Sequence, residues 1–408
     1  MKKLIFTALC IVVCNQVQAR PQPLMSGASA TADSAGTVTQ NPAGMTQFDS
    51  TQLRLDLYVL SSESTWQQDL GDTGFSTRTT TDSDLIVPNV SLVKPLSDDW
   101  YFGFGMMGYS VSDDYGDDWI GKYAMTEYSL LFISAFPSIG YKINDKWSVA
   151  GSLAANYTTY EQKKKVNNLE PGSPDGDLTI DADGFSLGYG FSTLYEFSER
   201  TRIGFNYQSE LDPELDGDPD FSGLDTTTED LFDQLGLLDA DISIDTVSPQ
   251  RANVGIYHEF ENRHAATFDI NWIDYSNFQL ADIYVNDNQI TESNFEYDDI
   301  WAYTLGYTFP LNDRWMLGFA GLYAPDMVDD DNRTITLRLD EIWAVGGGFE
   351  YQYRPNLSFD ATLSYVQVGD APVITDDIDA IGGPISGKFN DREMWILQFG
   401  VEWGPGAD

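Results

Sequence analysis

Alternating segments recur along most of this 408-residue chain, and they constrain its fold more than any other feature. Successive side chains of a β-strand point to opposite faces, so alternation places apolar residues on one face and small or polar residues on the other. After the N-terminus no apolar run reaches the ~20 residues that a membrane-spanning helix needs. The chain is therefore predicted to be all-β, and the period alone leaves a soluble sandwich and a membrane barrel open. One segment alternates Leu357, Phe359, Ala361, Leu363 and Tyr365 with Ser358, Asp360, Thr362 and Ser364.

Three observations favour the membrane barrel. The residues on the polar face have small side chains along the whole chain, which suits a wet or ligand-lined interior. Aromatic residues make up 13% of the chain and gather at strand ends, as Trp301 and Phe309 do at two ends of one segment. Connections also alternate between short and long, as turns and external loops do in outer-membrane barrels.

Six short turns and seven long loops separate fourteen predicted strands, so we expect a transmembrane antiparallel β-barrel over residues 51–403, followed by a tail at 404–408. The predicted strands are 51–61, 83–94, 100–112, 126–143, 147–161, 181–197, 201–211, 243–260, 264–275, 297–309, 314–325, 338–353, 356–368 and 392–403. The long loops are 62–82, 113–125, 162–180, 212–242, 276–296, 326–337 and 369–391.

Residues 1–19 have the form of a cleaved secretory signal peptide. Lys2 and Lys3 precede an apolar run from Leu4 to Cys14, and Val17-Gln18-Ala19 fits the cleavage site. A lipoprotein using Cys14 is the alternative, although Val13 is larger than the residue such sites prefer. Both cysteines lie in this segment, so the mature chain has no disulfide or thiolate chemistry. We expect export to the outer membrane of a Gram-negative cell.

The formal charge of -42 excludes nucleic acid as a partner, because the two would repel each other. The acidity suits solvation in a salty habitat. The alternative is divalent-cation binding by the acidic loops at Asp113–Asp118 and Asp212–Asp220, but neither fits the twelve-residue EF-hand spacing. We predict no metal and no cofactor.

Residues 20–50 do not alternate and are rich in Ala, Gly, Ser and Thr, so they form either a periplasmic tail or a plug. The segment Gly27–Met45, which ends in Asn41, Pro42, Ala43 and Gly44, resembles the N-terminal hatch of the FadL-type long-chain fatty-acid transporters. Asp117–Tyr157, Ser248–Phe260, Ile270–Phe278 and Tyr297–Gly321 are also similar to that family, in the same order.

The resemblance implies a fourteen-stranded barrel closed by a hatch at residues 20–50. It also implies that a hydrophobic ligand, a long-chain fatty acid or an aromatic hydrocarbon, is caught outside and leaves sideways beside a kinked third strand. Outer-membrane lipid and lipopolysaccharide are the expected surroundings of a monomer. Two features depart from the family: the stretch before Asn41 is short, and Gly404–Asp408 follows the terminal aromatic Trp403.

Lateral exit requires a break in strand pairing, and the third predicted strand contains Gly103, Gly105 and Gly108. Glycine tolerates bulges, so these residues are candidates for the kink. The alternative is that they only make room inside the barrel. Pro137 in the next strand cannot donate a ladder hydrogen bond and is placed opposite the gap.

Ligand capture requires an apolar surface outside the membrane, and the loop 212–242 offers one. Thr228 is a candidate cap for a short helix. Four apolar residues then share one face of that helix, which indicates a binding surface or a local cluster that packs the loop. They are Leu231, Phe232, Leu235 and Leu238.

A fatty-acid carboxylate needs a cation, and inward basic residues are scarce. Arg54, Arg202 and Arg251 fall at inward positions, and Lys122 is a further candidate. The alternative for each arginine is an ion pair with an inward acid such as Asp56 or Asp360, or a contact with the hatch.

Two other functions are weighed. A general diffusion porin is the alternative within the same membrane class, and the hatch-like N-terminus argues against it. An outer-membrane enzyme needs a nucleophile with a base, but His258 and His264 lie near a predicted periplasmic turn and no G-x-S-x-G elbow occurs. We therefore predict a transporter and not an enzyme.

Overall fold

The computed structural model describes residues 20–69, 78–277, 279–286, 288–289, 297–330, 333, 340–375 and 385–404. The predicted signal peptide at 1–19 lies outside the described residues, as do 405–408 of the predicted tail.

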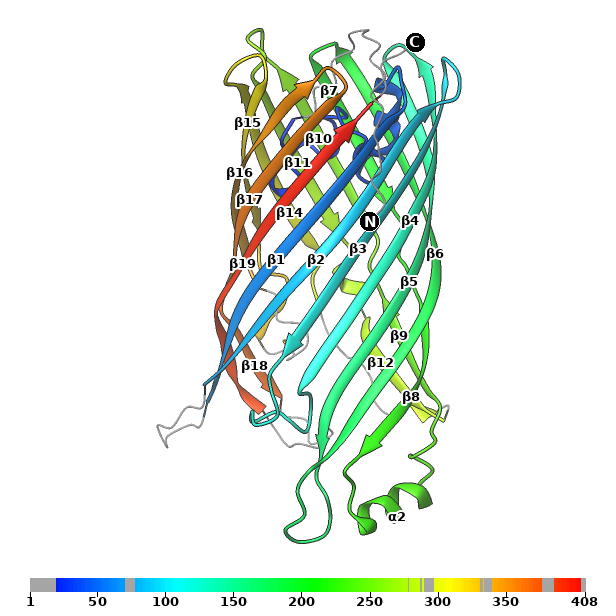
Figure 1. Ribbon diagram of the computed structural model, residues 1–408, viewed down its shortest axis with the longest axis vertical. Helices are drawn as coiled ribbons and strands as arrows, with labels where there is room; N and C mark the ends of the chain where they lie inside the picture. Colours follow the sequence, from blue (N-terminus) through cyan, green and yellow to red (C-terminus); the bar gives the residue numbers. More distant parts are fainter. Residues whose placement is uncertain are drawn as a thin grey trace, which may run out of the picture.

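Fourteen antiparallel strands form a closed wall, because the last of them, β19, pairs with β1 (Figure 1). The predicted fourteen-stranded barrel is therefore confirmed. The wall strands, in order, are β1 (Gln52–Gln68), β2 (Arg78–Pro95), β3 (Trp100–Asp114), β4 (Glu127–Asn144), β5 (Trp147–Val166), β6 (Gly176–Ser198), β7 (Thr201–Gln208), β10 (Arg251–Glu259), β11 (Ala265–Ile273), β14 (Ile300–Pro310), β15 (Trp315–Ala324), β16 (Ile342–Arg354), β17 (Leu357–Val368) and β19 (Ile385–Trp403).

The outer face of the wall is apolar and the inner face is polar. On β6, Phe185, Leu187 and Tyr189 point outward and expose about two thirds of their surface, whereas Ser186 and Ser192 point inward and are buried. Such exposure is favourable only where lipid replaces water. The large exposed residues therefore mark the membrane-facing band.

Five further strands lie outside this wall, and all of them except β9 fall where loops were predicted. They are β8 (Glu214–Ser222), β9 (Ile242–Val247), β12 (Gln279–Val285), β13 (Asn288–Gln289) and β18 (Ala371–Thr375). β8 pairs with β6 and β9, and β9 pairs with β12, so the sheet continues beyond the membrane band at the lower end of Figure 1.

The prediction of one continuous strand at 243–260 is wrong, because this segment forms two strands, β9 and β10. Pro249 lies in the break and has no N–H to donate. Only a single bridge, between Leu211 and Ser248, joins the neighbouring segments at this level. The predicted loop at 162–180 is also too long, since β5 extends to Val166 and β6 begins at Gly176.

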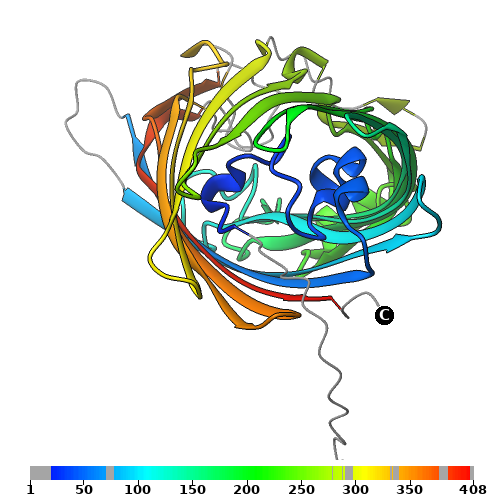
Figure 2. The same cartoon turned by 90° about the horizontal axis from the view of Figure 1, so that it is seen from above.

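Residues 20–50 lie inside the barrel at the short-turn end (Figure 2). They form three short helices, η1 (Pro23–Met25), α1 (Thr37–Gln40) and η2 (Pro42–Gln47). Their small side chains allow the backbone to approach the wall closely, and Ala30, Ala35 and Ala43 are fully buried. We call this segment the hatch. No helix in the described part of the chain is long and apolar enough to cross a membrane.

Candidate functional site in the barrel lumen

The Asn-Pro-Ala-Gly segment of the hatch is fixed by its chemistry. Asn41 caps η2 by accepting a hydrogen bond from the Ala43 amide at 3.2 Å, and Pro42 occupies the first helical position, where no N–H is needed. The Asn41 side chain also donates to the carbonyl oxygens of Ser29, at 2.6 Å, and of Thr193 on β6, at 3.2 Å. A β-carbon at Gly44 would lie 2.6 Å from that of Ala32. The segment therefore joins the two halves of the hatch to the wall.

Buried wall carboxylates hold the hatch backbone. Asp269 on β11 accepts hydrogen bonds from the amides of Gly27 and Ser29, at 2.7 and 3.2 Å. Glu402 on β19 accepts one from Ala35 at 2.7 Å. A hydrogen bond to a charged group typically contributes ~1.5–3 kcal/mol, compared with ~0.5–1.5 kcal/mol for one between neutral groups. These contacts fix the hatch at several points around the lumen.

Arg54 belongs to a buried ion cluster. Its guanidinium lies 2.6 Å from Asp56, 2.9 Å from Asp360 and 3.6 Å from Glu402. The sequence offered a structural ion pair as the alternative to ligand binding, and this is the arrangement observed. Because Glu402 also binds the hatch, the cluster connects the wall to the hatch.

Two further arginines join the hatch to the wall: Arg202 is on β7 and contacts the hatch, and Arg20 is part of the hatch. Arg202 donates to Gln47 at 3.2 Å, and its guanidinium lies 4.6 Å from the centre of the Tyr257 ring. Arg20 pairs with Glu259 on β10 and lies 3.5 Å from Asp33. Burial raises the pKa of Asp33 to about 6, against the opposing charges of Arg20, Arg202 and Arg54, and neither of its carboxylate oxygens accepts a side-chain hydrogen bond.

The backbone pairing between β2 and β3 ends partway along the wall. These strands pair only from Val90–Met106 to Pro95–Tyr101. Beyond that point residues 78–89 pair with β1 alone, and residues 107–114 pair with β4 alone. We call this stretch the split. Ile86 and Met106, which flank it, are 66% and 39% exposed, so its outer side faces lipid.

The glycines of β3 have other roles than the predicted kink. A β-carbon at Gly103 would lie 2.4 Å from Met45 Sδ, and one at Gly105 would lie 2.5 Å from Thr39, so both make room for the hatch. Gly108 lies in the split, opposite Val87. β3 pairs with β4 without any register shift, so there is no bulge. Pro137 is paired with Phe104, on the short-turn side of the split, and interrupts the β4–β5 ladder instead.

Beyond the hatch, the lumen contains a large apolar cluster, which we call the lumen cluster. It joins inward side chains of the strands on both sides of the split with the loop that follows β3. Its buried members are Trp66, Tyr115, Trp119, Met125, Tyr128, Leu130, Tyr160, Leu178, Ile180, Ala182, Leu215, Ile242, Ile244, Ala371, Val373 and Phe389. An apolar lining with a few polar groups is typical of sites for hydrophobic molecules.

Arg251 lies between the hatch and the lumen cluster. It shares the inward side of β10 with Gly255, whose β-carbon would touch Ser29 of the hatch. The Arg251 side chain is exposed to the lumen, and its Nε donates to Gln208 at 2.6 Å. No ion pair joins it to a carboxylate within the described part of the chain. The neighbouring Asn253 donates to Asn271 at 2.9 Å, so this level of the lumen is polar.

Of the apolar residues predicted for capture, Leu231 and Phe232 lie on α2 (Thr226–Gln234), which projects at the loop end (Figure 1), and Leu235 is its C-cap. Leu231 and Leu235 are 39% and 60% exposed, whereas Phe232 packs on Phe221 at 5.2 Å. Leu238 is half-buried beyond the helix.

The predicted cap of this helix is wrong: Asp225, not Thr228, accepts the hydrogen bond from the Thr228 amide. Thr228 instead accepts one from the Leu169 amide and docks the helix on the neighbouring loop. Lys122 lies in the loop after β3, where its Nζ is 2.6 Å from Asp175. The hydrogen bond from Lys122 lowers the pKa of Asp175.

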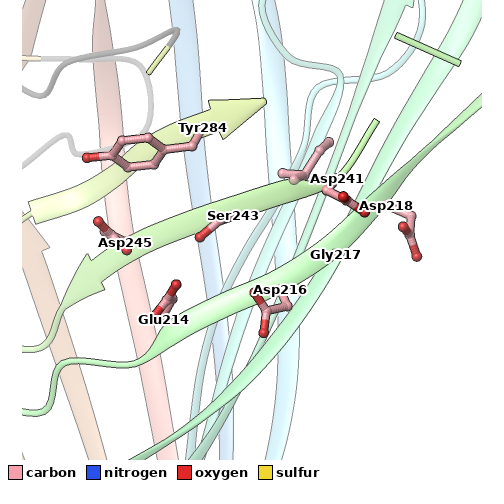
Figure 3. A pocket seen from close by; sticks show the side chains of 9 residues that line it. Glu214, Asp216, Gly217, Asp218, Asp241, Ser243, Asp245 and Tyr284 are labelled. Carbon is pink, nitrogen blue, oxygen red and sulfur yellow. The ribbon is translucent and has the colours of Figure 1, made fainter. Parts of the chain in front are cut away.

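A separate cavity of about 720 Å³ lies outside the membrane band between β8, β9 and β12 (Figure 3). Its lining is polar and acidic, which does not suit a hydrophobic ligand. Among the described residues, no group of three or more His, Cys, Asp or Glu side chains is arranged to hold a metal ion. The lining residues are Glu214, Asp216, Gly217, Asp218, Asp241, Ile242, Ser243, Asp245 and Tyr284.

The fold and lumen define a transmembrane barrel with an internal hatch and an apolar cluster in its lumen. The chain belongs to the outer membrane protein transport family (OMPP1/FadL/TodX), whose model matches residues 15–401. A long-chain fatty acid transport protein of Escherichia coli O6:H1 is 23% identical over 373 residues, covering 84% of this chain and 83% of the relative. Outer membrane protein P1 of Haemophilus influenzae is 21% identical and covers 91% and 88%.

Solved structures show the same fold. A Pseudomonas aeruginosa FadL homologue aligns with a TM-score of 0.83 at 18% identity, covering 96% of this chain and 98% of the homologue. The CymD monoaromatic hydrocarbon channel aligns with a TM-score of 0.68 at 17% identity, covering 97% and 100%. The protein is thus a Gram-negative outer-membrane barrel.

Sequence reasoning missed the aromatic residues of the lumen cluster. Trp66 was assigned to a loop after a strand ending at 61, and Phe389 to a loop before a strand beginning at 392. In the structure β1 and β19 continue to these residues past a register shift between Glu63 and Thr65. The shift adds one residue on β19, so Phe389 points inward although it is out of phase with Gln398, whereas Trp66 keeps the inward phase of Arg54. The sequence signal that could have revealed these inward positions was a large aromatic residue within a segment that otherwise reads as a polar loop.

Proposed function

We propose that this protein is a passive outer-membrane route for long-chain fatty acids or similar hydrophobic molecules. The split in the wall is the single observation that carries the proposal. A hydrophobic ligand gains no advantage from an aqueous axial pore, and the hatch occupies that axis at the short-turn end. An opening beside β3 leads from the apolar lumen to the lipid and keeps the ligand out of water.

Capture begins outside the membrane. Leu231 on α2 and Leu235 at its C-cap present an apolar surface beside Leu169, which is 52% exposed. The lumen cluster then receives the apolar chain. The apolar surface at α2 and the lumen cluster follow one another between the loop end and the hatch. The ligand therefore moves inward along apolar side chains and needs no energy source.

The carboxylate of a fatty acid is placed at Arg251. Arg54 is occupied by three carboxylates, Arg202 by Gln47 and Tyr257, and Lys122 by Asp175. Arg251 presents its guanidinium to the lumen, and Arg can bind a carboxylate in a bidentate manner.

Uptake tests this proposal. The chain is expressed in a Gram-negative strain lacking its own fatty-acid transporter, with a matched strain carrying an empty vector. Growth on a long-chain fatty acid is expected only with the chain. No rescue with a folded barrel in the outer membrane would exclude that substrate. In planar bilayers a large, stable open channel would favour a general porin instead.

An aromatic-hydrocarbon channel is the second candidate. It is favoured by the aromatic content of the lumen cluster and by the likeness to CymD and to the toluene transporter TodX of Pseudomonas putida. Faster uptake of a radiolabelled monoaromatic hydrocarbon than of a fatty acid in the same strain would support this candidate.

A further inference from the structure

Four aromatic side chains meet across the split on its lumen side, and we call them the aromatic clasp. Trp66 on β1 and Phe389 on β19 belong to the β2 side of the split. Tyr115 and Trp119 follow β3 and belong to the other side. The Trp66 ring centre lies 4.8 Å from that of Phe389 and 6.4 Å from that of Trp119, and Tyr115 stacks on Trp119 at 4.3 Å.

The clasp is densely packed. Trp66 and Phe389 are fully buried, and Tyr115 and Trp119 are 4% exposed. Tyr115 also contacts Phe389, with ring centres 6.3 Å apart, so both residues of the β3 side reach across. The clasp lies at the loop end of the split, beyond the β2–β3 hydrogen bonds that end at Val90 and Met106. It therefore joins the two edges of the split by side chains alone.

The loop that carries Trp119 is held from the far side. Lys122 pairs with Asp175, and Lys165 lies 3.1 Å from Asp117. The Lys165 amide donates to the Lys122 carbonyl oxygen at 2.8 Å. These contacts tie the loop to the β5–β6 connection and not to β1 or β2. Trp119 can therefore leave Trp66 without breaking any strand ladder.

We propose that Trp119 is a specificity-determining residue that limits the width of ligand able to pass from the lumen cluster into the split. This inference rests on the proposed lateral route. A slender alkyl chain needs only a small displacement of the clasp, because the rings slide without losing most of their contacts. A bulky ring system must expel Trp119 altogether and lose its packing with Trp66 and Tyr115.

A pair of ligands tests this inference. Uptake of a linear fatty acid and of a fatty acid of the same length with a terminal pyrene ring is measured in the transporter-deficient strain. The wild-type protein is expected to take up the linear acid at least tenfold faster. Trp119→Ala is expected to raise the ratio of bulky to linear uptake at least fivefold. Trp343→Ala, which removes the same side chain from the outer face of β16, is expected to leave the ratio at the wild-type value.

Lys122→Met provides a second test that keeps the ring, in case Trp119→Ala reduces folding. It loosens the loop and is expected to raise the same ratio at least twofold. An unchanged ratio in folded Trp119→Ala, or in Lys122→Met if the first variant does not fold, would overturn the inference. Uptake of neither ligand by the wild-type protein would instead contradict the proposed function.

Discussion

The Val87 side chain of β2 lies 3.4 Å from the position that a β-carbon would occupy at Gly108 of β3, across the part of the wall where these strands do not pair. The two positions face each other over the split. They therefore allow the split to be closed by a covalent bond without a change elsewhere in the barrel.

The double variant Val87→Cys/Gly108→Cys is expected to form a disulfide, since Val87 Cγ1, which marks a position that a cysteine sulfur can take, lies 3.4 Å from the β-carbon position at Gly108. Both native cysteines lie in the predicted signal peptide. Oxidation should abolish uptake of the linear fatty acid, because the cross-link bars the lateral route, and reduction should restore it. Each single-cysteine variant serves as a control. Full uptake by the oxidised protein would place the exit elsewhere.

The barrel was predictable from sequence because lipid imposes alternation on every wall strand. The lipid face of β6 shows this, with Phe185, Leu187 and Tyr189 at every second position. β8 was missed because its alternating partners are acidic. Glu214, Asp216 and Asp218 occupy every second position of β8, and such an acidic segment is also typical of a polar loop. The acidic composition therefore concealed the two-residue alternation of a strand.

The site was less predictable, since it depends on contacts between distant segments. Gly103 was selected for lateral exit, but its neighbour is Met45 of the hatch. Arg54 was selected as an inward cation for the ligand. In the structure it is surrounded by three carboxylates, one from its own strand β1 and one each from β17 and β19. Sequence gives the face on which a side chain lies, and it does not give the partner opposite.

Docking of the hatch depends on Gly204 of β7. A β-carbon there would lie 1.7 Å from the Ser29 carbonyl oxygen and 2.7 Å from the Asn41 side-chain nitrogen. Gly204→Ala should therefore weaken docking by about 1–3 kcal/mol, an increase of roughly 5- to 150-fold in the undocked population. Ion leak through single proteins in planar bilayers measures that population. Gly151→Ala is the matched control, because its β-carbon would meet nothing closer than 4.0 Å. Equal leak from the two variants would contradict this account of docking.

Hatch docking should also depend on pH through Asp33. Its pKa is raised from 3.8 to about 6 by burial, so the docked state binds the proton more tightly than the undocked state. Docking is then strongest below about pH 4 and weakens as pH rises to about 6, by at most about 3 kcal/mol. Above that range the contribution is constant.

The pH prediction is checked by comparing the wild-type protein with Asp33→Asn. Leak of the wild-type protein is expected to increase between pH 4 and pH 6, and the variant, which cannot ionise, should lose that increase. Other buried carboxylates titrate in both proteins, so the difference between the two isolates Asp33. Identical pH profiles would show that Asp33 does not control docking.

Arg251 provides the test that separates a fatty acid from an uncharged hydrocarbon. Arg251→Met keeps an apolar stem and removes the cation that faces the lumen, so affinity for a free fatty acid should fall. A hydrogen bond to a charged group contributes about 1.5–3 kcal/mol, which corresponds to a loss of roughly 10- to 150-fold. The methyl ester of the same acid carries no charge, and its affinity should not change. Equilibrium binding of both ligands to the purified barrel measures the difference, and Arg200→Met, in the turn before β7, is the control for removal of a charge. If the acid and the ester lose affinity equally, Arg251 contributes to the shape of the lumen and does not bind the carboxylate.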